Sequence, residues 1–178
     1  MKKIIAFAGS NSSSSINHKL VTYVAGLAQQ AEVEVIKLTD YSLPIYSEDI
    51  EKENGFPKPL AELMSKIKEG DGVIIAMNEH NSGWSSFFKN TMDWLSRLER
   101  SYLEGIPVLL VSTSPGGRGG QSSMDFGVNN LPRVGAQVIH GITVPRFYNN
   151  FDQDEGVISE PELKAKLQAA MADLEAAL

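Results

Sequence analysis

The sequence predicts an α/β protein in which helices cover both faces of a mostly parallel, five-stranded sheet. Short apolar runs bounded by turn residues alternate with longer segments whose apolar residues recur at helical spacing. Such alternation is typical of parallel sheets, because each crossover brings a helix onto one face. No internal repeat or linker divides the chain, so residues 1–178 are expected to form one doubly wound domain.

The first part of the chain contains two of the expected strands. Residues 3–8 are an apolar run that ends at a glycine, and residues 33–38 alternate in hydropathy. Between them, residues 16–30 place Leu20 and Val24 on one helical face. Residues 41–56 contain proline, asparagine and glycine, so we expect an irregular segment there.

The middle of the chain repeats the alternation. Apolar stripes predict helices over 57–69, 83–100 and 122–134, the last weakened by Gly127 and Pro132. In the helix over 83–100, Trp84, Phe88 and Leu95 lie on the expected core stripe and Trp94 lies toward its edge. The strands between these helices are expected at 73–77, 107–112 and 136–139.

A last helix is expected to begin at Ser159. Glu162 follows three residues later, which is the spacing of a capping box, and Pro161 lies in the first turn, where proline is tolerated. The buried stripe of this helix comprises Leu163, Leu167, Met171 and Leu174.

Composition limits the possible functions. The chain has no cysteine, which excludes disulfides, thiolate metal sites and a cysteine nucleophile and is typical of a reducing cytoplasm. Its formal net charge of −6, with no Lys/Arg cluster, argues against binding nucleic acid or an anionic membrane. No apolar stretch approaches the roughly 20 residues of a membrane span, and the apolar run after Lys2 is too short for a signal peptide. We therefore expect a cytoplasmic protein.

Three loops follow the first, third and fourth major strands: residues 9–17, 78–83 and 112–121. All are rich in small polar residues, and the carboxyl edge of a doubly wound sheet is where ligands bind. The first loop joins a strand to a helix N-terminus, so its hydroxyls and backbone N–H groups suit a phosphate. A flexible serine linker or a plain helix cap is the alternative. Neither a dinucleotide fingerprint nor a nucleotide P-loop is present.

The other two loops allow less specific readings. Glu79 and His80 are too few for a metal site, and a surface loop explains them better than acid–base catalysis does. The glycines of residues 116–120 permit a close approach of a ligand to the backbone, although a mobile loop would look the same. No Gly-x-Ser-x-Gly elbow supports a serine hydrolase.

Taken together, the three loops resemble those of the NADPH-dependent FMN reductase family, which includes related azo-, quinone- and chromate-reducing flavoproteins. The family's first loop reads Gly-Ser-x-Arg-x-x-Ser-x-Asn, and Gly9-Ser10, Ser15 and Asn17 match it while Ser12 replaces the arginine. The other matching segments are Leu43–Tyr46, Asn78–Asn81, Phe88–Trp94 and Ser114–Gly120.

The resemblance implies a flavodoxin-like fold of strand order 2-1-3-4-5 with FMN as cofactor. NADPH or NADH would deliver hydride through FMN to a small electron acceptor, such as a quinone, azo compound, free flavin or metal oxyanion. Because the redox chemistry belongs to the flavin, no side chain is expected to act as an acid or base in catalysis. Arg118 is a further candidate, for attracting a nicotinamide nucleotide phosphate. The family also implies a homodimer or tetramer formed through helix 84–100. The residues that the resemblance places on FMN are Ser10, Ser12, Ser15, Ile16, Asn17, Glu79, His80, Asn81, Ser82, Ser114, Gly116 and Gly117.

Two alternatives remain open. A non-enzymatic flavodoxin-like electron carrier would need a protein reductase, and a flavin-binding or phosphate-sensing protein would show no turnover. The loss of arginine at position 12 predicts weaker retention of FMN, because a charge-assisted hydrogen bond contributes about 1.5–3 kcal/mol.

Overall fold

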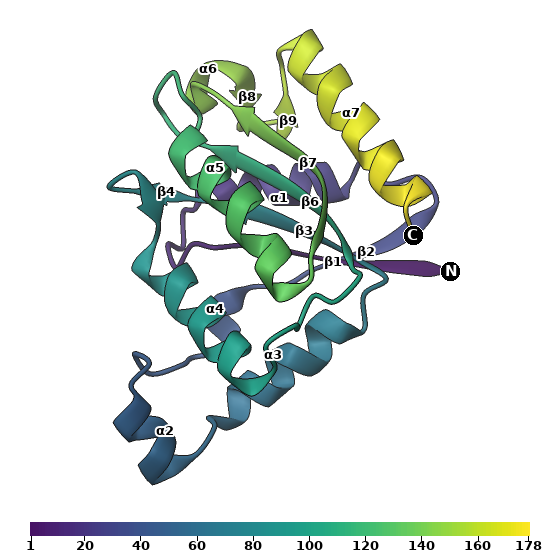
Figure 1. Ribbon diagram of the computed structural model, residues 1–178. Coiled ribbons are helices and arrows are strands. Elements are labelled where there is room, and N and C mark those ends of the chain that lie inside the picture. Colours follow the sequence, from purple (N-terminus) through teal and green to yellow (C-terminus); the bar gives the residue numbers. More distant parts are fainter.

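The computed structural model describes all of residues 1–178 and contains a five-stranded parallel sheet at its centre (Figure 1). The strands lie in the order β2-β1-β3-β6-β7. In chain order this is 2-1-3-4-5, the flavodoxin-like arrangement, so the predicted fold class is confirmed. The bounds of the strands are β1 (Lys2–Ala8), β2 (Ala31–Val35), β3 (Gly72–Met77), β6 (Pro107–Thr113) and β7 (Gln137–Val144).

Helices pack on both faces of the sheet because alternate strand residues point to opposite faces. Ile4 and Ile74 belong to an apolar cluster shared with two helices, α1 (Ile16–Ala25) and α7 (Pro161–Ala176). Their neighbours Ile5 and Val73 belong to a second cluster on the other face. That face is covered by α3 (Lys58–Lys68), α4 (Ser86–Leu98) and α5 (Gln121–Asn130).

Two of the expected segments differ from the structure. Residues 41–56 are not irregular throughout, since they contain α2 (Glu48–Asn54), capped by the Ser47 hydroxyl and projecting from the body of the protein (Figure 1). No residue of α2 is fully buried, so it left no core stripe in the sequence. The helix expected over 83–100 begins only at Ser86, because a two-stranded hairpin precedes it: β4 (Glu79–His80) and β5 (Gly83–Trp84).

Other boundaries also differ. Helix α1 ends at Ala25, earlier than expected, with Gly26 as its C-cap. The strand expected over 33–38 is β2, which runs from Ala31 to Val35 and is followed by a 3-10 turn, η1 (Leu38–Asp40). Strand β7 continues to Val144, five residues beyond the predicted end, because it pairs with β6 along its whole length. The helix expected over 122–134 is divided into α5 and a 3-10 turn, η2 (Leu131–Val134), at Pro132, which lacks the backbone donor that an α-helix needs.

The expected capping box of the last helix is wrong. The cap of α7 is Glu160, whose carboxylate accepts hydrogen bonds from the backbone N–H groups of Glu162 and Leu163. Ser159 instead donates its backbone N–H to the Asn150 carbonyl, which ties it to the preceding segment. That segment consists of the short helix α6 (Phe147–Asn150) and the hairpin of β8 (Phe151–Asp152) and β9 (Val157–Ile158).

Side chains of helix α4 hold the segment that follows β2 in place through hydrogen bonds. Trp94 is fully buried rather than at the edge of the core, and its indole N–H donates to the Pro44 carbonyl at 2.8 Å. The Asn90 amide donates to the same carbonyl and accepts from the backbone N–H of Tyr46. Two residues of the Phe88–Trp94 motif therefore hold Pro44–Tyr46 in place.

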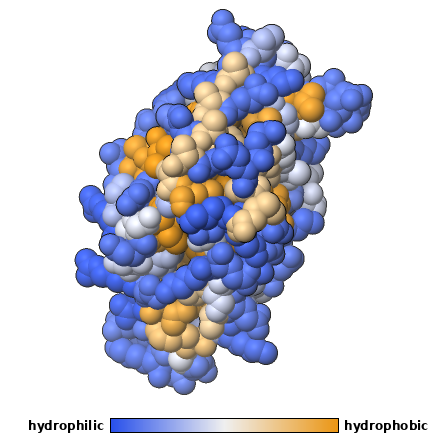
Figure 2. Space-filling model, turned by 90° about the vertical axis from the view of Figure 1, so that its right-hand side faces the viewer, coloured by the Kyte–Doolittle hydropathy of each residue, from blue (hydrophilic) through white to orange (hydrophobic).

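No helix is long and apolar enough to cross a bilayer. On the face that carries α7 and both termini, apolar side chains form separate patches among polar ones (Figure 2). The buried hydrophobic residues lie in the two apolar clusters, one on each face of the sheet.

Candidate functional site

The three predicted loops meet at one cavity of about 260 Å³ at the carboxyl edge of the sheet. Their side chains come from segments far apart in sequence, which the parallel strand arrangement brings to the same edge. Eight of the twelve predicted site residues line this cavity: Ser10, Ser12, Ser15, Ile16, Asn17, Glu79, His80 and Ser114. Asn81, Ser82, Gly116 and Gly117 do not.

The serine loop presents backbone donors beside the N-terminus of α1. Ser15 caps the helix, and its hydroxyl accepts a hydrogen bond from the backbone N–H of His18 at 3.1 Å. The backbone N–H groups of Ile16 and Asn17, in the first turn, have no protein acceptor. Free N–H groups at a helix N-terminus favour an anion. The hydroxyls of Ser12 and Ser14, 3.3 Å apart, add donors at the rim.

The Asn17 side chain has a structural partner of its own. It is only 3% exposed, and its amide group donates to the Thr113 carbonyl at 3.1 Å while accepting from the Thr113 backbone N–H at 3.0 Å. These paired hydrogen bonds connect the first turn of α1 to the end of β6. Only the backbone N–H of Asn17 is therefore free to bind a ligand.

The second loop is a tight hairpin. Asn81 and Ser82 form its turn and both have positive φ angles, 50° and 61°, as a type I′ turn requires. This geometry directs the two turn residues away from the cavity, whereas Glu79 and His80 on β4 line it. The Glu79 carboxylate accepts from the backbone N–H of Ser123 at 3.0 Å and so caps α5, whose own cap position is a glycine.

Asn78 is a cavity residue that the sequence did not single out. It is 6% exposed, and its side-chain oxygen Oδ1 has no hydrogen-bond partner in the protein. Its amide nitrogen Nδ2 lies 3.5 Å from His80 Nε2. A buried acceptor without a partner costs free energy unless a ligand or water satisfies it. Its position directly after an apolar strand was the available signal.

The third loop contributes Ser114 and Pro115 to the cavity, together with Thr113 at the end of β6. The Ser114 and Gly116 carbonyls accept hydrogen bonds from the backbone N–H groups of Phe147 and Arg146. These bonds bring Tyr148, 60% exposed, to the cavity rim. Tyr148 follows the last major strand, outside all three loops, and was not predicted.

Comparison with known proteins identifies the chain. A sequence model described as NADPH-dependent FMN reductase matches residues 2–155. The chain belongs to this family. The predicted activity of an NAD(P)H-dependent FMN oxidoreductase and the predicted cofactors are therefore confirmed at the level of the family.

Individual similar proteins have names that describe related oxidoreductase activities. A quinone reductase of Escherichia coli K12 is 34% identical over 119 residues, which cover 66% of this chain and 63% of that protein. An NAD(P)H:quinone oxidoreductase of Solanum tuberosum is 27% identical and covers 98% of this chain and 91% of its own length. The solved structure of FerB, a flavoenzyme NAD(P)H:(acceptor) oxidoreductase from Paracoccus denitrificans, has a TM-score of 0.78 at 24% identity, covering 99% and 98% of the two chains, and shows the shared fold.

The cavity fits the cofactor of the FMN reductase family. Free backbone N–H groups and hydroxyls suit a phosphate at one end, and Asn78, whose buried side-chain oxygen has no partner in the protein, lines the other end beside Glu79 and His80. No group of three or more His, Cys, Asp or Glu side chains is placed so that it could hold a metal ion. Arg118 is exposed and donates to the Ser122 hydroxyl at 3.2 Å.

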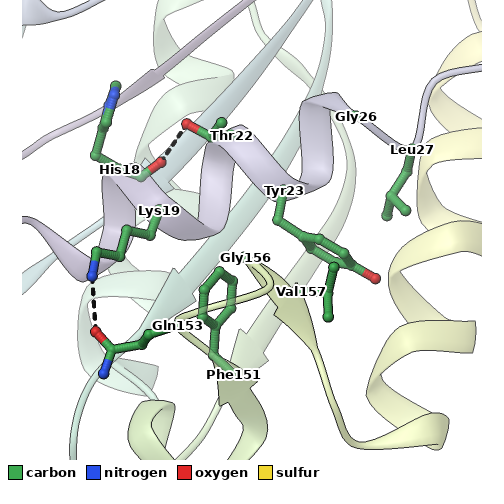
Figure 3. A pocket seen from close by; sticks show the side chains of 10 residues that line it. All are labelled: His18, Lys19, Thr22, Tyr23, Gly26, Leu27, Phe151, Gln153, Gly156 and Val157. Carbon is green, nitrogen blue, oxygen red and sulfur yellow. Dashed lines mark hydrogen bonds between the residues drawn. The ribbon is translucent and has the colours of Figure 1, made fainter.

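A larger cavity, of about 530 Å³, lies away from the three loops, between α1 and the β8–β9 hairpin (Figure 3). The rings of Tyr23 and Phe151 form its apolar wall, and Lys19 Nζ donates to Gln153 Oε1 at 2.8 Å across its edge. None of the predicted site residues lines it.

Proposed function

We propose that this protein reduces a small acceptor, such as a quinone, azo compound, free flavin or metal oxyanion, with NAD(P)H through FMN held in the cavity of the three loops. The observation that supports the proposal is the convergence of a serine-rich helix N-terminus, the β4–β5 hairpin and the Ser114 loop on that cavity. Residues 1–178 would act as one FMN-binding domain in the cytoplasm, as the absence of cysteine suggests.

Each loop would have a separate part in binding. The backbone N–H groups of Ile16 and Asn17, with the hydroxyls of Ser10, Ser12 and Ser15, would hold the phosphate. Asn78, Glu79 and His80 would lie along the ring on one side and Ser114 on the other, with the predicted residues Asn81, Ser82, Gly116 and Gly117 further out.

When bound, the flavin supplies the hydride chemistry. The chain's contribution is then to orient the ring and exclude water. The Glu79 carboxylate is already engaged with Ser123, so the structure gives it a positioning part rather than that of an acid or base.

The deciding experiment is spectroscopic. The purified protein, reconstituted with FMN, is expected to have a flavin spectrum that NADPH or NADH bleaches without any protein partner and that a quinone restores. An electron carrier would be reduced only slowly without a reductase, and a binding protein would retain its colour. A preparation that fails to bind added FMN would overturn the proposal.

Restoring the missing cation should tighten FMN binding. The Ser12→Arg substitution places a guanidinium at the phosphate cradle, and a charge-assisted hydrogen bond contributes about 1.5–3 kcal/mol. Because about 1.4 kcal/mol corresponds to tenfold, the dissociation constant should fall tenfold or more. Titration of the apoprotein with FMN measures it, with Gln30→Arg as the control because Gln30 precedes β2 at the opposite edge of the sheet. Equal affinity in both variants would contradict the placement of the phosphate.

We also propose a homodimer, or a tetramer built from it, formed through α4 and the adjoining surface of α5. Phe126 and Val128 on α5 are 42% and 39% exposed, and the Phe126 ring packs against Trp84, just before α4, at 4.7 Å. The outer face of α4 is polar, with an ion pair between Lys89 and Asp93. Protein interfaces combine an apolar core with a polar rim, and Phe126 and Val128 would supply the apolar part of this one.

The Phe126→Asp substitution is expected to convert the assembly to monomers, because it places a charge in the apolar part of that surface. Light scattering at micromolar concentration measures the mass. Val157→Asp is the matched control, since Val157 is 37% exposed but lies on the distant β8–β9 hairpin. A monomeric mass for the wild-type protein would refute the proposal.

A further inference from the structure

A second cavity lies beside the cavity of the three loops and has a volume of about 390 Å³. It adjoins the phosphate cradle, which is the serine loop at the N-terminus of α1. Ser10 and Ser12 line both cavities, so a ligand can extend from one to the other across the serine loop. The far wall of the second cavity comes from the segment after β2, which contributes Lys37, Thr39 and Asp40. None of the residues of the second and third loops reaches it. The second cavity therefore lies at the phosphate end of the site, away from the position of the flavin ring.

The charged groups of this cavity have no partners in the protein. Lys37 and Asp40 are exposed and take part in no ion pair. Most other lysines near the sheet are paired, for example Lys3 with Glu34 and Glu69. A free cation and a free carboxylate at one cavity suit a ligand that carries both an anion and hydroxyl groups.

His18 reaches the same cavity from α1. Its imidazole points away from Tyr23 and Phe151, toward the opposite side of the helix (Figure 3). Burial, and secondarily the positive charge of Lys37, lower the pKa of His18 below its ordinary value. At neutral pH, Lys37 is therefore the cation of the cavity and His18 a neutral hydrogen-bonding group.

We propose that this cavity accommodates the adenylate half of FAD, so that the site accepts FAD as well as FMN. The first phosphate lies in the serine cradle, the second next to Lys37, and the Asp40 carboxylate accepts hydrogen bonds from ribose hydroxyls. A carboxylate beyond the second strand of a doubly wound sheet has this role toward ribose in dinucleotide-binding folds. The inference rests on the proposed function, because it requires the cradle to hold the flavin phosphate.

A nicotinamide nucleotide fits this cavity less well. Its reactive ring must approach the flavin ring, which lies between the second and third loops, and the cavity contacts neither loop. A dinucleotide flavin, in contrast, is connected through its phosphate to the place where the cavity begins.

The test compares the dissociation constants of FMN and FAD for the apoprotein by quenching of flavin fluorescence. In the wild-type protein, FAD is expected to bind within about tenfold of FMN. Lys37→Ala should weaken FAD by tenfold or more and FMN by less than threefold, and Asp40→Asn should weaken FAD alone. Lys58→Ala, which removes an exposed lysine from α3, is the matched control and should change neither constant.

Three outcomes would overturn the inference. If FMN binds and FAD binds more than a hundredfold more weakly, the cavity does not take an adenylate and the proposed function stands. If Lys37→Ala weakens both flavins equally, Lys37 serves the cradle phosphate instead. If neither flavin binds, the proposed function fails with the inference.

Discussion

The Asn17→Asp variant is expected to be less stable than the wild-type protein by about 3 kcal/mol at pH 8, and by less at pH 5. The wild-type amide donates to the Thr113 carbonyl and accepts from the Thr113 backbone N–H in a site that is 3% exposed. An ionised carboxylate keeps the second hydrogen bond but loses the first. It also faces a carbonyl oxygen, without solvent.

The pH dependence follows from the same geometry. Burial and the neighbouring carbonyl disfavour the ionised carboxylate, so the pKa of the introduced Asp is raised above its unfolded value of about 3.9. A protonated carboxyl can donate to the Thr113 carbonyl as the amide does. Stability is therefore retained near and below the unfolded pKa and is lost as the pH rises through the raised, folded pKa.

Urea denaturation of the apoprotein between pH 5 and pH 8 measures this effect, and the thermal midpoint should fall by roughly 2–4 °C for each kcal/mol. Asn129→Asp is the control, because Asn129 is exposed and makes one hydrogen bond, to the Asp125 carbonyl. A loss for Asn17→Asp no larger than that of the control, or one independent of pH, would mean that the pair of hydrogen bonds with Thr113 does not connect α1 to β6.

The sequence was sufficient for the fold because the dominant signal, alternation of buried strands with amphipathic helices, extends over the whole chain. Prediction of helices and strands from the sequence failed where few residues are buried, and where contacts with distant segments determine the local structure. Helix α2 has no buried residue, so no apolar stripe marked it. The end of β7 is set by pairing with β6, and the cap of α7 by a bond between Ser159 and Asn150; neither can be read locally.

The candidate site was predictable in outline for a related reason. The topology rule places the ends of three strands at one edge, so the three loops could be brought together before any side chain was considered. The roles of particular side chains could not be predicted from this rule, because they depend on partners far apart in sequence. Asn17 is engaged by Thr113 and Glu79 by Ser123, and Asn78 became a candidate only because its oxygen is buried without a partner.

The Gly120→Ala substitution is expected to destabilise the protein by about 2–4 kcal/mol, through backbone strain and a lost buried hydrogen bond. Gly120 is the N-cap of α5 and has a φ angle of 83°, a left-handed conformation that disfavours alanine. A Cβ atom there would overlap Ser112 Oγ, which donates a hydrogen bond to the Met77 carbonyl at 2.7 Å. Ser112 is fully buried, so its hydroxyl has no other place to find an acceptor without moving the strands.

A double-mutant cycle separates the two causes. In a Ser112→Ala background the overlap is gone, since the nearest remaining atom of residue 112 is its Cβ at 3.4 Å, and Gly120→Ala should then cost only the strain, about 1 kcal/mol. Gly117→Ala is the matched control in the same loop, because its Cβ would come no closer than 3.8 Å to any atom and its φ is not positive. Equal losses for Gly120→Ala and Gly117→Ala in urea denaturation would contradict a structural requirement at Gly120. The expected difference would show that the glycines of this loop are not equivalent, since the packing of α5 against β6 requires glycine at position 120 but not at position 117.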